Sequence, residues 1–172
     1  MKQLHAMLAC AAMVCLPAFS QTANRMTKPD SDWAMKAAQG GMAEVKLGQL
    51  AADKGSNSVV KSFGQQMVQD HTKANDELKQ IASSKGMTLP TSLSAKDQSL
   101  YDKLSKLSGA EFDREYMSDM VSDHKTDIAE FQKEARSGND SDLKNFASKT
   151  VPTLQHHLQM AEDGYKQVKS AK

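Results

Sequence analysis

A short phrase that combines aspartate with histidine occurs twice in the chain. The sequence contains Met67-Val68-Gln69-Asp70-His71 and, further along, Met120-Val121-Ser122-Asp123-His124, and the same alignment pairs Phe63 with Tyr116. Imidazole is the commonest protein ligand for transition metals such as zinc, copper and iron. The repeat therefore predicts two equivalent helices that each present a histidine at one level. These histidines either hold a metal ion or belong to a polar core.

Two further side chains complete this level. A helix turns by about 100° per residue, and on that basis four residues fall in the apolar stripes of four different helices, each close to its helix midpoint. These residues are Glu44, His71, His124 and His157. One carboxylate and three imidazoles suit zinc, copper or iron better than magnesium or calcium, which prefer oxygen ligands. We therefore predict a mononuclear centre with these four residues as metal ligands.

Nearby aspartates and methionines extend this hypothesis. An aspartate can orient a ligating imidazole as a hydrogen-bond acceptor or act as an extra ligand, and thioether sulfur beside imidazole suits Cu(I). The secondary candidates are Asp70, Asp123, Asp127, Met67, Met120 and Met160. The three methionines share one side of the histidine level only if the second and third long helices run parallel.

A metal-free core is an equally open interpretation. Glu44 and the histidines could form a buried hydrogen-bonded network that fixes the register of the helices. Methionines at helical spacing commonly fill a core. Against this, a buried glutamate is costly unless it is paired or bound to a cation. The sequence leaves zinc, copper, iron and no metal as alternatives.

The residues in question lie on predicted amphipathic helices. Apolar positions that step by threes and fours, with Ser, Asp or Asn before each segment and Gly after it, predict long helices over 33–54, 57–85, 110–136 and 141–168. A short helix follows Ser94 in the long connection between the second and third. We therefore expect an all-α, ferritin-like four-helix bundle with a crossover connection that carries the short helix. An up-down-up-down bundle is the alternative.

One glycine pair lies inside the first predicted helix. Gly40-Gly41 lowers helix stability, by around 1 kcal/mol for each glycine relative to alanine. The presence of this pair in a helix therefore needs a reason other than helix propensity. We expect close helix packing at this point. A local bulge near a site is the alternative.

The N-terminus resembles a secretory signal. Lys2 supplies the charge, residues 6–16 form a short apolar run, and residues 17–20 offer a small-residue cleavage site. We expect a signal peptide over 1–20, a flexible linker over 21–32 and the bundle over 33–169, in the periplasm or outside the cell. The small-residue rule favours this cleavage over lipidation at Cys10 or Cys15.

Charge and hydropathy exclude two classes of partner. The chain has 22 basic and 21 acidic residues, so loss of Lys2 with the signal leaves a balanced protein. We expect no binding to nucleic acid or to an anionic membrane through bulk charge. No segment after the signal approaches the roughly 20 apolar residues of a transmembrane helix.

Several spaced motifs together resemble a known family. They are residues 38–48, 60–63, 67–73, 112–113, Tyr116, 120–124, 143–146 and 152–158. Over residues 33–168 the chain is similar to the bacterial exported domain-of-unknown-function family 4142. The resemblance implies a predicted outer-membrane or periplasmic protein that is similar to ferritin-like bundles. It implies little about activity.

The chain departs from true di-iron ferritin-like proteins. Those proteins use a Glu-x-x-His motif on two helices, and this motif is absent from the long predicted helices. We therefore do not expect ferroxidase chemistry or iron storage. We expect a non-enzymatic periplasmic protein with a stress-related or metal-handling role. The alternatives are a small metalloenzyme with redox activity and an envelope interaction module without metal.

Overall fold

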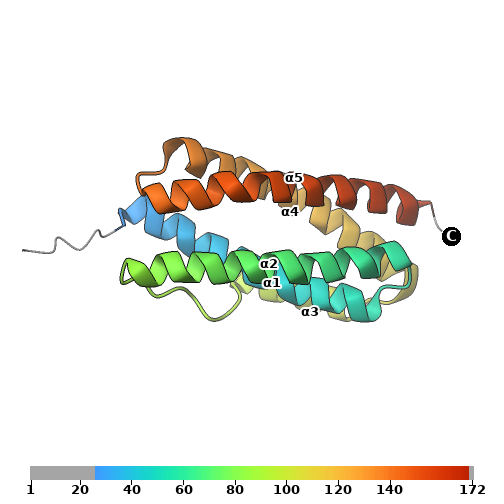
Figure 1. Cartoon of the computed structure of the whole chain (residues 1–172). Coiled ribbons are helices and arrows are strands. Elements are labelled where there is room, and N and C mark those ends of the chain that lie inside the picture. The colour runs from blue at the N-terminus through green and yellow to red at the C-terminus, as the bar shows by residue number, and fades with distance from the viewer. Residues whose placement is uncertain (1–25, 171–172) are drawn as a thin grey trace, which may run out of the picture.

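The computed structural model of the chain describes residues 26–170. These residues form four long helices and one short helix, with no strand in this range (Figure 1). The structure confirms the all-α prediction. The expected signal peptide lies outside the described residues. The helices are α1 (Lys28–Lys54), α2 (Ser58–Ser84), α3 (Ala95–Ser105), α4 (Gly109–Ser137) and α5 (Ser141–Lys169).

Helix α1 begins at Lys28 instead of the expected Trp33, so the last part of the expected 21–32 linker is helical. The side chain of Thr27 accepts a hydrogen bond from the backbone N–H of Asp30, and Pro29 occupies the first turn, where a missing N–H costs nothing. Asp30 is buried and accepts a hydrogen bond from the backbone N–H of Asn139 at 3.0 Å. This tertiary contact extends the helix beyond its apolar stripe.

The starts of α2, α3 and α5 follow the capping residues in the sequence, whereas Ser108 before α4 makes no side-chain cap. Asn57, Ser94 and Asp140 each accept a hydrogen bond from a backbone N–H in the first turn of the helix that follows. After α2 the chain turns at Gly86, whose φ of 69° is a left-handed conformation that glycine adopts without strain. Local side-chain chemistry therefore sets most helix ends.

The long helices pair as α1 with α2 and as α4 with α5 (Figure 1). Asp113, near the start of α4, accepts hydrogen bonds from the backbone N–H groups of Ser56 and Asn57, which precede α2, at 3.0 and 2.8 Å. At the other end, Lys85 after α2 contacts Asp140, which follows α4. Helices α2 and α4 therefore run in the same direction, and the connection between them, which carries α3, returns along the molecule.

The apolar core is divided into two clusters. The Phe63 cluster contains Leu47, Ala51, Val60, Phe63, Met67, Leu104, Phe112, Tyr116, Met117, Met120, Ala161 and Val168. The Phe146 cluster contains Ala34, Ala38, Leu78, Phe131, Leu143, Phe146, Ala147 and Leu154. Along each long helix, one of the four predicted polar residues falls between the two clusters. The buried polar residues Glu44, His71, His124 and His157 thus form a level inside the core.

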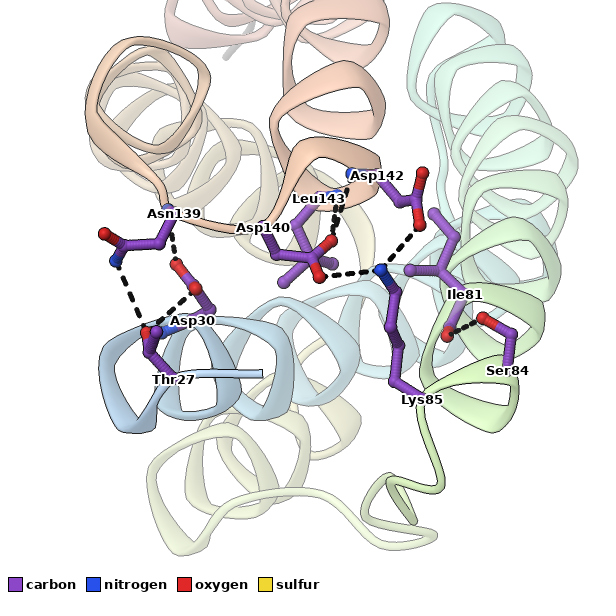
Figure 2. Close-up of polar contacts among 9 residues, drawn as sticks. All are labelled: Thr27, Asp30, Ile81, Ser84, Lys85, Asn139, Asp140, Asp142 and Leu143. Carbon is purple, nitrogen blue, oxygen red and sulfur yellow. Dashed lines mark hydrogen bonds and ion pairs between the residues drawn. The ribbon is translucent and has the colours of Figure 1, made fainter. Parts of the chain in front are cut away.

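An ion pair joins the end of α2 to the start of α5 (Figure 2). The Nζ atom of Lys85 lies 2.7 Å from Asp140 and 2.6 Å from Asp142, and the side chains of Lys85 and Asp140 are only 5% and 4% exposed. Burial alone would raise the pKa of Asp140, but hydrogen bonds from Lys85 and from the backbone of Leu143 hold it below its ordinary value of 3.8. The ionised pair therefore stabilises this end of the molecule.

We expect Lys85→Met to lower the free energy of unfolding at pH 7 by roughly 1–3 kcal/mol, because Asp140 stays buried but loses its cationic partner. The contribution of Asp140 is present above pH 3.8 and is lost as the pH falls through its lowered pKa in the folded state. Urea denaturation between pH 7 and pH 3 should therefore show the two proteins converging at the acid end.

The control is Lys73→Met, which removes an exposed lysine from α2, the helix that Lys85 follows. This variant should stay within about 0.5 kcal/mol of the wild type. Equal stability of the Lys85 and Lys73 variants at pH 7 would contradict the role given to the ion pair.

Candidate metal centre

Three histidines from three helices meet in the centre of the molecule. His71 lies on α2, His124 on α4 and His157 on α5, and their exposed fractions are 7%, 0% and 0%. One potential ligand atom from each histidine lies within 4.8 Å of those of the other two. The ring centroids are 5.4–5.9 Å apart. The structure thus brings together three of the four residues that the spacing singles out; that they bind a metal stays a prediction.

Each histidine has one buried ring nitrogen without a hydrogen-bond partner among the described residues. These atoms are Nε2 of His71, Nε2 of His124 and Nδ1 of His157. The second nitrogen is held in two cases: Nδ1 of His124 lies 3.0 Å from the carbonyl oxygen of Met120, and Nε2 of His157 lies 2.8 Å from Oδ2 of Asp70. In the neutral rings these nitrogens donate to the two oxygens, which leaves a lone pair on the other nitrogen. Metal-binding histidines are oriented in this way.

The surroundings keep the imidazoles neutral. Burial, together with the smaller effect of the neighbouring His124 and His157, lowers the pKa of His71 to about 3. Burial likewise lowers the pKa of His124 to about 4. For His157, burial lowers the pKa and the contact with Asp70 partly offsets this. All three rings can therefore offer a lone pair to a cation at neutral pH without first losing a proton.

Glu44 of α1 lies beside this group and is not one of the three. Its side chain is 1% exposed, and its Oε1 lies 4.0 Å from Nδ1 of His124, the nitrogen that faces the Met120 carbonyl. Burial raises the pKa of Glu44 well above 4.5, and the neighbouring carboxylates of Asp123 and Asp127 raise it further. Burial therefore favours the neutral acid form of Glu44 in the metal-free protein. A role as fourth ligand stays a prediction and requires loss of this proton.

The secondary candidates take different positions. Asp70 contacts His157, across the interface between α2 and α5, in the acceptor role expected of it. Asp127 is near Glu44, and burial together with the charge of Asp123 raises its pKa to about 7. The methionines Met67 and Met120 are fully buried in the Phe63 cluster, and Met160 packs against it. Because α2 and α4 run parallel, all three methionines lie on the same side of the histidine level.

In the sequence, Tyr116 stood out only as the counterpart of Phe63 in the repeat. Its hydroxyl is buried and has no hydrogen-bond partner in the described range, and burial and the nearby Glu44 raise its pKa. A signal for it was present, because Tyr116 stands in the apolar stripe of α4 about two turns before His124. The hydroxyl of Tyr116 is thus a further polar group, besides His124, in the apolar stripe of α4.

Comparisons with known proteins agree with the motifs in the sequence. The family model described as "Domain of unknown function (DUF4142)" matches residues 16–163. The chain belongs to this family. No curated protein matches it. The DUF4142 chain is also similar to a solved structure described as the crystal structure of a DUF305 fragment from Deinococcus radiodurans, with a TM-score of 0.73 and 12% identity, over 83% of this chain and 99% of that one. At this identity the likeness shows the fold alone.

The protonation of Glu44 leads to a prediction for the metal-free protein. Above pH 4.5 the unfolded chain loses the Glu44 proton while the folded chain keeps it, because the pKa is raised on folding. This group therefore lowers stability as the pH rises from 4.5 towards the folded pKa, by up to about 1.4 kcal/mol per pH unit. Glu44→Gln removes the effect, so its melting temperature relative to the wild type should rise as the pH increases from 5 towards the raised pKa of Glu44 in the folded protein.

Asp76→Asn, which replaces an exposed acid on α2, is the matched control and should show no such trend. A Glu44→Gln protein whose melting temperature follows that of the wild type at every pH would mean that Glu44 is ionised in the folded protein.

Proposed function

We propose that this DUF4142 protein is an exported, non-enzymatic metal-handling protein that binds one transition-metal ion at His71, His124 and His157. A single observation carries the proposal: three buried imidazoles converge, and each has a nitrogen without a hydrogen-bond partner in the described part of the chain. Glu44 is the candidate fourth ligand, and Asp70 orients His157.

The energetics favour this interpretation over a metal-free polar network. Leaving a buried acceptor without a hydrogen bond costs about 1–3 kcal/mol for each group. Within residues 26–170, the three histidine nitrogens and Oε2 of Glu44 are all left in this state. A network that served only to fix helix register would use these atoms to contact one another. One cation would satisfy all three imidazoles together, and Glu44 after loss of its proton.

The donor set also limits the metal. Three neutral imidazoles suit zinc, copper and iron, and they do not suit magnesium or calcium. The methionines Met67, Met120 and Met160 on one side of the histidine level support copper, and Cu(I) in particular. If Glu44 ionises on binding, its charge offsets one positive charge of the ion.

The fold that we propose for this function is a ferritin-like four-helix bundle with a crossover connection. Its support is the parallel direction of α2 and α4, which the contacts of Asp113 and Lys85 establish, and the likeness in fold to the DUF305 fragment. In such bundles, metal sites are built from side chains on facing helices. The three histidines come from three different helices, which agrees with this pattern.

Two further features support export and a non-enzymatic role. The features of residues 1–20 favour export to the periplasm. Separately from these two features, none of the helices within residues 26–170 has the length and hydropathy of a membrane span. His124 and His157 are fully buried and His71 nearly so, and a catalytic metal needs an open position for substrate. Binding and release of an ion fit this burial better than turnover of a substrate.

The test is metal analysis of the protein purified without an affinity tag, followed by titration with Zn²⁺, Cu⁺ and Fe²⁺. We expect one ion per chain for at least one metal. Saturation at about 100 times the dissociation constant should raise the melting temperature by roughly 5–10 °C. The double variant His71→Ala/His124→Ala should bind no ion and show no such rise.

The matched control is His156→Ala, which removes the exposed histidine next to His157 on the same helix. It should bind metal as the wild type does. A wild type that carries no stoichiometric metal and gains no thermal stability from any of the three ions would refute the proposed function.

A further inference from the structure

A narrow cavity leads from the surface to the histidine centre. Its volume is about 40 Å³, and its lining extends from the exposed Lys36 and Glu130 to the buried ring of His71. Apolar side chains of the Phe146 cluster form much of its wall. The polar groups in the lining include the side chains of Asn75 and Asp127. The cavity therefore joins solvent to one histidine of the centre and contains oxygen donors on the way.

The exposure of the histidines agrees with access from this side. His71 borders the cavity and is 7% exposed, whereas His124 and His157 are 0% exposed. An ion that approaches the centre through the bundle therefore meets His71 first.

Gly40 has no packing role of the kind that other helix glycines have. A Cβ atom on Gly41 would collide with the side-chain amide of Asn75, and one on Gly48 would lie 2.7 Å from the carbonyl oxygen of Gly64. A Cβ atom on Gly40 would meet no described atom within 4 Å, apart from the local helix backbone. Glycine in a helix interior costs about 1 kcal/mol relative to alanine. Close packing explains Gly41 and Gly48, and the cavity that Gly40 borders is what explains Gly40.

We propose that this cavity is the route by which the metal ion reaches and leaves the three-histidine centre, and that Gly40 is the residue that keeps the route open. This inference rests on the proposed function. A volume of about 40 Å³ has room for only about three waters, at 10–15 Å³ each. A hydrated cation must therefore give up most of its water to pass. The side-chain oxygens of Asp127 and Asn75 replace part of that hydration on the way to His71.

An obstruction in this route should change the rate at which the metal ion exchanges without changing the affinity of the centre for the ion. Gly40 lies outside the ligand set, so filling the cavity at this position leaves the bound state unchanged. The same obstruction stands in the path of an ion that enters and of an ion that leaves. A side chain at position 40 should therefore slow association and dissociation by the same factor.

The experiment measures Zn²⁺ and, in parallel, Cu⁺ exchange in Gly40→Leu and in the wild type. Uptake by the metal-free protein and loss to an excess of a chromogenic chelator are followed in time, and the dissociation constant is measured by competition. We expect both rates to fall by about tenfold or more, which corresponds to a barrier higher by about 1.4 kcal/mol. The dissociation constant should stay within about threefold of the wild type.

Two further variants keep the test decisive. Gln39→Leu places the same side chain on the preceding residue, which is outside the cavity lining. This variant should exchange metal at the wild-type rates. Gly40→Ala fills less of the cavity and should slow exchange to a smaller degree, while its melting temperature rises because alanine favours the helix. Gly40→Ala carries the test if Gly40→Leu does not fold.

The outcomes distinguish the two proposals. A wild type that binds no metal overturns the proposed function and this route with it. A wild type that binds metal, together with Gly40 variants that exchange it at the wild-type rates, overturns the route alone. Weaker binding by Gly40→Leu with an unchanged association rate also overturns it, because position 40 would then shape the site and not the path to it.

Discussion

The burial of a polar level inside an apolar core is the constraint on which the rest of this molecule depends. Glu44 and three histidines lie between the Phe63 and Phe146 clusters, where charged imidazoles would be strongly disfavoured. Burial therefore keeps the rings neutral, and a neutral ring has one donor and one acceptor nitrogen. His124 and His157 use their donors on the Met120 carbonyl and on Asp70. The acceptor nitrogens that remain are the atoms that could hold a metal ion.

The direction of the helices makes this level possible. Polar contacts at both ends join α2 to the α4–α5 pair: Asp113 accepts hydrogen bonds from the residues that cap α2, and Lys85 pairs with Asp140 beyond the end of α2 (Figure 2). With α2 and α4 parallel, the two copies of the repeated phrase place their histidines at equal height. The same direction puts Met67 and Met120 on one side of the histidines.

Neighbouring glycines on α1 have different physical roles. Gly41 lets the side chain of Asn75 approach the helix, whereas Gly40 faces the open space of the cavity beside His71. From the sequence we expected close packing or a bulge at this pair. In the structure, close packing explains only Gly41, which contacts Asn75. The α1 backbone remains helical through both glycines, so no break in the helix accompanies the cavity.

The sequence by itself determined the all-α class, most helix ends and the level of the polar residues, because capping chemistry and a period of 3.6 residues are local properties. Local patterns missed the start of α1, which depends on the distant contact of Asp30 with Asn139. Only the tertiary structure decided that His71, His124 and His157 converge while Glu44 lies to one side, and that Asp70 holds the histidine of another helix. The physical reason is that a stripe defines the buried face of a helix, whereas the neighbouring helices decide which atoms on that face meet.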